Sequence, residues 1–345
     1  MKPLRCAVIG LGMGQNHARG YQELSEAHLV AVADTNPKQL DPWVANVGKQ
    51  GCFTDYKKML KDVKPDLVSI ALPNFLHASV SIDCLRAGAH VLCEKPMALD
   101  VKQARRMAMI AKQAGRKFGI NLSYRFTPAA RALKDMAERG FLGQPYHATT
   151  RWLRRDAFPG FGGWFGQKRV SGGGPLIDLG VHRIDLAMWL MKNPEPVSVS
   201  GTTHSLIGIP RARTLKKPFD VEDFATGFIR FANGASLVLE MSWAGHQEQA
   251  EIMSTTVMGT RGTLVHRNEG GGYDFVGEYF SEINGHKIQG LVSAPRAIIP
   301  SPFKDMVQAV IHNRQPLAGP EDGIRMQRIL DGLYRSAKLK REVRI

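Results

Sequence analysis

The stretch LRCAVIGLGMG, residues 4–14, decides the fold of the first part of the chain. Its first half, Leu4–Ile9, is short and apolar, as is typical of a strand buried in a parallel sheet. Gly10, Gly12 and Gly14 follow at once, and side chains there would keep the backbone from approaching a pyrophosphate. A polar segment comes next, and the N–H groups at a helix start bind phosphate. The stretch therefore predicts a strand, a tight turn and a helix that bind a dinucleotide.

The next apolar run supports the dinucleotide, because three glycines alone would fit any tight turn. Leu29–Ala33 is predicted to be a strand, and Asp34 stands at its end, 24 positions after Gly10. A carboxylate at that place accepts a hydrogen bond from a ribose 2′-hydroxyl and repels a 2′-phosphate. The sequence therefore favours NAD over NADP. A loop-capping role of Asp34 is the alternative.

Strands and helices then alternate, which predicts a doubly wound parallel sheet. The expected strands are residues 66–72, 90–93 and 117–122, and the expected helices are residues 78–87 and 101–113. Ligands of such sheets bind beyond the carboxyl ends of the strands. Polar residues that directly follow two of these strands are therefore expected to line one crevice over the cofactor, namely Pro73, Asn74, His77, Glu94 and Lys95.

Size and composition fit a soluble enzyme of two domains. The 345 residues exceed one small core, and 43% hydrophobic with 22% charged residues is ordinary for a globular protein. No apolar run approaches the roughly 20 residues needed to cross a bilayer. The start of the chain leaves no room for a signal peptide before the first strand. The cysteines show no close pairing, which indicates reduced thiols and a cytoplasmic protein: Cys6, Cys52, Cys84 and Cys93.

The formal net charge of +15 leaves nucleic-acid binding as an alternative. The basic residues are scattered over the whole chain, and no helix-turn-helix or zinc-finger spacing accompanies them. A basic surface that attracts anionic ligands is the simpler interpretation. We therefore predict no nucleic-acid partner and no membrane.

An acid and an imidazole, Asp178 and His182, stand four residues apart just after the glycines 172–174. That spacing places both on one face of a helix that opens from a tightly turning loop. The carboxylate can hold one tautomer of the ring, which then meets a substrate proton. A capping and packing pair is the alternative. Zinc would need a third ligand, which the neighbouring sequence lacks, so no metal is predicted.

Motifs along nearly the whole chain resemble those of the Gfo/Idh/MocA family of glucose–fructose oxidoreductases and inositol dehydrogenases. The matching residues are Gly10-Leu11-Gly12, Val32-Ala33-Asp34, Pro73-Asn74 with His77, Ala87-Gly88-Ala89-His90-Val91, Glu94-Lys95-Pro96, Tyr124-Arg125-Phe126 with Pro128, and Ser171-Gly172-Gly173-Gly174 with Asp178, Gly180 and His182. The stretch from Pro316 to Ser336 also has the family's closing pattern. Leu72, Gln15 and Phe165 depart from the family's usual residues.

The resemblance implies an NAD-binding Rossmann domain at residues 1–122 and a substrate-binding α+β domain at residues 123–345. The second domain would contain a large open, mostly antiparallel sheet, whose helix-free face forms a homodimer or homotetramer. Periodicity and turn signals agree, because they predict strands at residues 196–201, 225–231, 235–243 and 251–258.

The resemblance also implies that Lys95, Asp178 and His182 form the catalytic set. His182 is the natural acid/base, Lys95 supplies a cationic donor to the reacting oxygen, and Asp178 orients the ring or holds a hydroxyl. The expected cofactor contacts are Gly10, Gly12, Met13, Gly14, Asp34, Leu72, Pro73, Asn74, His77, Glu94, Lys95, Asn121 and Trp164. The expected substrate contacts are Lys95, Tyr124, Arg125, Trp152, Arg154, Trp164, Asp178 and His182.

Aromatic and charged residues between 151 and 168 suggest a loop that closes over a sugar. Arg151, Trp152, Arg154 and Arg155 begin this loop, and its basic groups could instead serve an acidic sugar or a phosphate. The predicted activity is NAD-dependent oxidation of a secondary hydroxyl of a sugar, sugar derivative or cyclitol, or the reverse. A redox-assisted glycosidase and a non-catalytic NAD-binding regulator are the two alternatives on the same fold.

Overall fold

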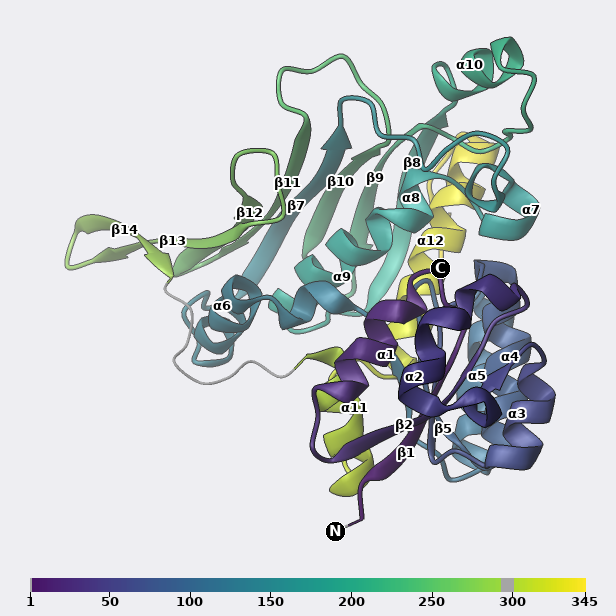
Figure 1. Ribbon diagram of the computed structural model, residues 1–345. Helices are drawn as coiled ribbons and strands as arrows, with labels where there is room; N and C mark the ends of the chain where they lie inside the picture. Colours follow the sequence, from purple (N-terminus) through teal and green to yellow (C-terminus); the bar gives the residue numbers. More distant parts are fainter. Residues whose placement is uncertain (1, 293–300) are drawn as a thin grey trace. The chain divides into compact units, whose positions relative to one another are not determined.

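The computed structural model describes residues 2–292 and 301–345. The chain divides into two compact units, Met1–Leu122 with Pro300–Gln327, and Ser123–Ile299 with Arg328–Ile345 (Figure 1). The sequence predicts a boundary after Leu122, where the first unit also breaks. It places residues 300–327 in the second domain, whereas they pack within the first unit. The division by function into residues 1–122 and 123–345 stays a prediction.

The first unit is built on six parallel strands in the order β3-β2-β1-β4-β5-β6. Their bounds are β1 Leu4–Ile9, β2 Ala27–Ala33, β3 Cys52–Phe53, β4 Leu67–Ile70, β5 His90–Cys93 and β6 Phe118–Ile120. The order reverses between β1 and β4, and ligands of such sheets bind at this reversal, beyond the carboxyl ends of the strands. The predicted doubly wound parallel sheet is confirmed.

Helices connect these strands and cover the sheet. They are α1 Gly14–Gln22, α2 Val44–Val47, α3 Tyr56–Val63, α4 Asn74–Arg86, α5 Val101–Gln113, α11 Pro302–Ile311 and the start of α12 Pro320–Leu339. Helix α11 packs on α1, because the Phe303 ring lies 5.8 Å from that of Tyr21 and an added Cβ at Gly20 would collide with it. Met306 and Val307 complete the apolar core.

The second unit contains a nine-stranded sheet in the order β14-β13-β12-β11-β7-β10-β9-β8-β15. The strands are β7 Pro145–Arg154, β8 Pro196–His204, β9 Phe224–Phe231, β10 Ser236–Ser242, β11 Glu251–Gly259, β12 Gly262–Asn268, β13 Phe275–Ile283, β14 His286–Val292 and β15 Val343–Arg344. All neighbours are antiparallel except β7 and β10. The predicted large, mostly antiparallel sheet is confirmed.

The helices of the second unit include α6 Pro128–Glu138, α7 Lys168–Ser171, α8 Pro175–Asp178, α9 Gly180–Leu190 and α10 Gly208–Thr214. Every residue of α9 is buried, and the helix lies across β7, β10 and β11. A helix that is covered on all sides is rigid, because close packing leaves its side chains little room to move. The side chains of α9 are therefore well suited to hold a fixed geometry.

One element differs from the sequence interpretation. Residues 151–154 are not part of a loop, because they belong to the central strand β7. Buried and exposed residues alternate along this strand, with Ala148, Thr150 and Trp152 buried. The charged side chains at positions 151 and 154 obscure this pattern in the sequence. The loop proper begins after Arg154.

All four cysteines are unpaired, as the sequence predicts. In the part of the chain that the structure describes, no helix combines the length and apolar character that crossing a bilayer requires.

Candidate functional site

The glycines of the loop after β1 are required for different reasons, some by the fold and one by a ligand. Gly10 has φ of +86°, and an added Cβ there would collide with the carbonyl oxygen of Ala71. An added Cβ at Gly14 would lie 2.9 Å from Val8 Cγ1, so packing also demands this glycine. At Gly12 nothing lies within 4 Å of the added atom. Only a group that approaches from outside would need Gly12, and a pyrophosphate is such a group.

Helix α1 opens directly from this loop. Its N-cap residue Met13 is 64% exposed, and no side chain caps the first turn. The first N–H groups of a helix carry a partial positive charge and need acceptors. The loop and the helix start therefore fit the phosphates of a dinucleotide.

Asp34 lies at the end of β2 and closes the same loop. Its Oδ2 accepts a hydrogen bond from Leu11 N at 2.7 Å, and its Oδ1 accepts one from Asn36 N at 2.8 Å. The structure therefore contains the loop-capping role that the sequence left as an alternative. Each carboxylate oxygen has two acceptor positions, so a ribose hydroxyl can still donate to the same group.

Glu94, directly after β5, joins three elements of the first unit. Its Oε1 accepts hydrogen bonds from His17 Nε2 at 2.9 Å and from Asn121 Nδ2 at 2.6 Å, and its Oε2 accepts one from Lys95 N at 3.1 Å. Burial alone would raise the pKa of Glu94. The hydrogen bond and charge of His17, the charge of Lys95 and the hydrogen bond of Asn121 outweigh this effect of burial. Together they lower the pKa of Glu94 to about 2. Glu94 therefore stays ionised and fixes the backbone at Lys95.

His77 is fully buried between two carbonyl oxygens. Its Nδ1 lies 2.7 Å from the oxygen of Pro96, and its Nε2 lies 2.8 Å from that of Leu72. With both nitrogens occupied and no exposed surface, His77 ties the end of β4 to the segment that carries Lys95. This arrangement favours a structural role, and the cofactor contact at His77 stays a prediction. Leu72 and Pro73 remain partly exposed, whereas Asn74 is buried at the start of α4.

The glycines before Asp178 are required by close packing in the second unit. Added Cβ atoms at Gly173 and Gly174 would collide with the Tyr334 hydroxyl and the Glu222 carbonyl oxygen, respectively. The expected single helix is interrupted, because α8 ends at Asp178 and α9 begins at Gly180. Asp178 Oδ2 accepts a hydrogen bond from Trp243 Nε1 at 3.1 Å.

His182, near the start of α9, is 8% exposed and lies against two aromatic rings. Its ring centroid is 4.9 Å from that of Tyr124 and 5.9 Å from that of Trp152. These contacts restrict the ring, while the small exposed surface leaves an edge accessible. An imidazole held in this way suits proton transfer to one position.

Trp152 and Arg154 extend from β7 to Glu251, the first residue of β11. Trp152 Nε1 donates to Glu251 Oε1, and Arg154 Nε donates to the same oxygen at 2.6 Å. Trp152 is only 3% exposed, so its ring offers little surface for stacking on a substrate. The predicted substrate contacts of Trp152 and Arg154 stay predictions. Sequence reasoning missed Glu251. Glu251 lies opposite Arg154 in the pairing of β11 with β7. Recognition of β7 in the sequence would therefore have indicated Glu251 as the partner of Arg154.

Arg125 forms a buried ion pair. It donates to Asp185 through Nε at 2.8 Å and through Nη2 at 2.6 Å, and both side chains are buried. This bidentate pair ties the turn Ser123–Phe126 to α9. The pair favours a structural role for Arg125, and its substrate contact stays a prediction.

A second buried arginine, Arg183, was also missed. Its Nη1 donates to His266 Nδ1 at 3.2 Å, His266 Nε2 lies 3.2 Å from Thr127 Oγ1, and Thr127 Oγ1 donates to the Tyr124 carbonyl oxygen at 3.1 Å. Burial and the Arg183 charge hold the pKa of His266 well below its usual range. Burial also lowers the pKa of Arg183 to about 10. This chain of hydrogen bonds supports Tyr124, which in turn contacts His182.

The loop after β7 is held by contacts between aromatic side chains, including Phe219 from the segment before β9. Phe158 lies 5.0 Å from Phe161, which lies 5.2 Å from Phe219. Trp164 stacks on Phe165 at 3.9 Å and remains partly exposed. The predicted contacts of Trp164 with cofactor and substrate stay predictions.

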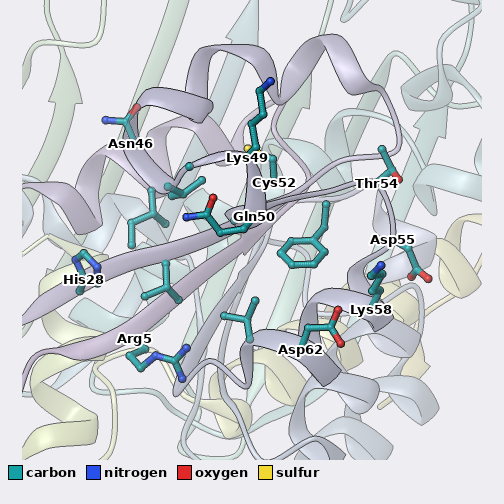
Figure 2. A pocket seen from close by; sticks show the side chains of 17 residues that line it. Arg5, His28, Asn46, Lys49, Gln50, Cys52, Thr54, Asp55, Lys58 and Asp62 are labelled. Atoms are coloured by element: carbon teal, nitrogen blue, oxygen red, sulfur yellow. The ribbon is translucent and has the colours of Figure 1, made fainter.

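The first unit also has an open pocket of about 1010 Å³ beside β2 and β3 (Figure 2). Arg5, Lys49 and Asp62 are among its lining residues; Arg5 is half-buried, and Lys49 and Asp62 are exposed. The residues predicted to bind the cofactor take no part in this lining. Among the described residues, no cluster of three or more His, Cys, Asp or Glu side chains is suited to a metal ion.

Two family models match the chain. Residues 4–122 match the oxidoreductase family with an NAD-binding Rossmann fold, and residues 130–265 match the GFO/IDH/MocA C-terminal domain. The chain is 33% identical to D-glucoside 3-dehydrogenase of Escherichia coli (strain K12), over 97% of this chain and 96% of that protein. It is 29% identical to levoglucosan dehydrogenase of Pseudarthrobacter phenanthrenivorans, over 78% of this chain and 75% of that protein.

Among solved structures, levoglucosan dehydrogenase in complex with NADH and levoglucosan has a TM-score of 0.87 to this chain. The two are 24% identical, and the match covers 100% of both chains. At this identity the likeness shows that both proteins share one fold.

Proposed function

The chain belongs to the Gfo/Idh/MocA oxidoreductase family with an NAD-binding Rossmann fold, and from this premise we propose that it is an NAD-dependent dehydrogenase. Its proposed substrate is a secondary hydroxyl of a sugar, sugar derivative or cyclitol, or the corresponding ketone. One observation carries the proposal. His182 is held against two aromatic rings with one accessible edge, in a chain whose first unit contains a dinucleotide loop.

The proposed roles follow from the chemistry of the groups. NAD, when bound, supplies the acceptor for the hydride and its two electrons. His182 takes the hydroxyl proton as the carbonyl forms, and it returns that proton in the reverse direction. The Lys95 ammonium group donates to the same oxygen and stabilises its developing negative charge. Asp178 orients the imidazole or holds a neighbouring hydroxyl. The proposal requires Lys95 and His182 to act on one substrate oxygen.

The cofactor is proposed to be NAD, with NADP disfavoured. The first unit would hold the pyrophosphate at Gly12 and the start of α1, and the adenosine ribose at Asp34. A 2′-phosphate would meet the negative charge of the Asp34 carboxylate, whose two oxygens are fixed by Leu11 N and Asn36 N.

The direct test measures NADH formation by the full chain across sugars, inositols and glycosides, with released aglycone followed in parallel. NADH formed stoichiometrically with product is the expected result. Release of aglycone without net NADH would overturn the dehydrogenase in favour of a redox-assisted glycosidase. His182→Ala is expected to lower kcat by about 10²–10⁴-fold. His204→Ala, an exposed histidine on β8, is the matched control and should leave kcat unchanged.

Lys95→Met tests the second role separately. The variant should keep its affinity for NAD, measured by calorimetry, and lose turnover. A variant that binds no NAD would instead make Lys95 a cofactor anchor. Combining the two changes tests the shared oxygen, because the effects on kcat should then be far from additive.

Assembly and location are also proposals. Phe280, Ile283 and Leu291 on β13 and β14 are large apolar side chains with 39%, 56% and 67% exposure. Such residues support association of the sheet with a second copy, as a homodimer or homotetramer. Light scattering on the wild type and on Leu291→Glu would test this. Four unpaired thiols support a reducing, cytoplasmic location.

A further inference from the structure

Resting on the proposed function, we propose that Glu251, Arg154 and Tyr273 form a subsite beside His182 that binds substrate hydroxyls. We further propose that this subsite selects a neutral polyhydroxyl compound, such as a glycoside, over an acidic sugar or a sugar phosphate.

The three side chains form one hydrogen-bonded group. Arg154 Nε donates to Glu251 Oε1 at 2.6 Å, and Arg154 Nη2 donates to the Tyr273 hydroxyl oxygen at 3.0 Å. The Tyr273 hydroxyl in turn donates to Glu251 Oε1 at 3.5 Å. Within the described chain, these side-chain contacts of Glu251 all use Oε1. Its second oxygen therefore remains an acceptor for a substrate hydroxyl.

The group borders the same indole ring as His182. The Arg154 guanidinium carbon lies 5.1 Å from the centre of the Trp152 ring, and the Tyr273 ring lies 6.3 Å from it. The His182 ring lies 5.9 Å from the same indole. A substrate whose reacting hydroxyl meets His182 would therefore extend its neighbouring hydroxyls toward Glu251 and Arg154.

Exposure distinguishes the supporting residue from those that can bind. Trp152 is 3% exposed, so its ring is covered. Tyr273 is 57% exposed, and the side chains of Arg154 and Glu251 keep 17% and 13% of their surface accessible. A pyranose ring has an apolar face and a polar rim. The Tyr273 ring can cover the face while the carboxylate and guanidinium groups bind the rim.

Charge decides which sugars fit. The positive charge of Arg154 is compensated by the negative charge of Glu251. Burial alone would lower the pKa of Arg154. The hydrogen bond and charge of Glu251, together with the charges of Tyr273 and Asp178, instead raise the pKa of Arg154. Two carboxylates thus act on one guanidinium group. A further anionic group, such as the carboxylate of a uronic acid or a phosphate, would be repelled by both.

Other arginines nearby do not supply the missing cation. Arg125 is engaged by Asp185 in a buried bidentate pair. Arg183 is fully buried, with its guanidinium carbon 5.6 Å from the Tyr124 ring. Of these three arginines, Arg154 is therefore neutralised, and Arg125 and Arg183 are covered.

The test measures binding to the NAD-bound full chain by calorimetry, with methyl glucoside and methyl glucuronoside as the neutral and acidic probes. The wild type should bind the neutral probe about tenfold or more tightly than the acidic one. Glu251→Gln keeps the side-chain volume and removes the charge. It should weaken binding of the neutral probe and raise the acidic-to-neutral affinity ratio about tenfold, because Arg154 loses its counter-charge.

Glu248→Gln is the matched control, since it makes the same change at an exposed position three residues away and should leave both affinities unchanged. Tyr273→Phe keeps the ring and loses the hydroxyl, so it should lower the affinity for the neutral probe only a few-fold. Should Glu251→Gln fail to fold, Arg154→Gln replaces it in the test. This variant should bind both probes more weakly than the wild type does, and it should still exclude the acidic probe.

An unchanged affinity ratio in Glu251→Gln would overturn the subsite. So would a wild type that prefers the acidic probe or binds neither probe. The measurement needs no turnover, so its failure is distinct from that of the dehydrogenase. Binding of the glucoside without NADH formation from any substrate would overturn the proposed function and leave the subsite standing.

Discussion

Replacing Glu94 with Gln should destabilise the protein by an amount that depends on pH. The pKa of this carboxyl is about 2 in the folded chain, against an ordinary value of 4.5. That difference corresponds to about 3 kcal/mol of stability at neutral pH. Only 15% of the Glu94 side chain is exposed, so solvent screening is small. Because the folded pKa is lowered, this stability is fully present above about pH 4.5 and is lost as the pH falls toward about 2.

Urea denaturation of the wild type and of Glu94→Gln at several pH values measures this term. Gln resembles the protonated carboxyl, so the difference in unfolding free energy should be about 3 kcal/mol at neutral pH. It should fall to roughly half of that by about pH 3. Glu248→Gln, at an exposed position, should show no such difference. A difference that stays constant with pH, or a variant as stable as the wild type at neutral pH, would refute the assigned role of Glu94.

Three other changes test the nucleotide-binding unit. Gly12→Ala should leave the melting temperature unchanged and weaken NAD binding about tenfold or more. Gly10→Ala should instead destabilise the protein by about 1–3 kcal/mol, because the backbone at Gly10 has a positive φ. Equal effects of the two changes on stability would contradict this distinction. His77→Ala should lower kcat about 10²-fold through misplacement of Lys95, with NAD affinity unchanged. A weaker NAD affinity at constant kcat would instead support the predicted cofactor contact at His77. Asp34→Ala should weaken NAD and relax discrimination against NADP, and unchanged selectivity in binding assays would exclude its proposed role.

The sequence predicts the first unit well because its strands are buried on both faces. Such strands are continuous apolar runs, and β1, β5 and α5 have the expected bounds. Helix α4 begins four residues before its predicted start, at Asn74. The missed strand β7 shows the limit of this reasoning. Its second half contains Arg151 and Arg154, so the run resembles a polar loop unless its two-residue alternation is counted.

The site divides in the same way between local and distant pairs. Asp178 and His182 are four residues apart, so their spacing alone allows them to be predicted together, although Asp178 ends α8 and His182 lies in α9. The ion pair of Arg154 with Glu251 joins residues 97 positions apart, and the hydrogen bond of Arg183 with His266 joins residues 83 positions apart. Such partners come together only in the folded structure, where distant strands and helices pack against one another. No local sequence pattern therefore predicts them. The sequence also cannot reveal burial, which favours structural roles for His77 and Arg125.

The return of α11 to the first unit has a consequence for how the protein is made. Residues 1–122 leave the ribosome long before Phe303, Met306 and Val307, which cover α1 and complete the core around it. Until then, Tyr21 and its neighbours lack their apolar cover, and such exposed surface favours aggregation. The nucleotide-binding unit is therefore begun first and completed only after most of the second unit has been synthesised, and a fragment that stops at Leu122 would keep this surface uncovered.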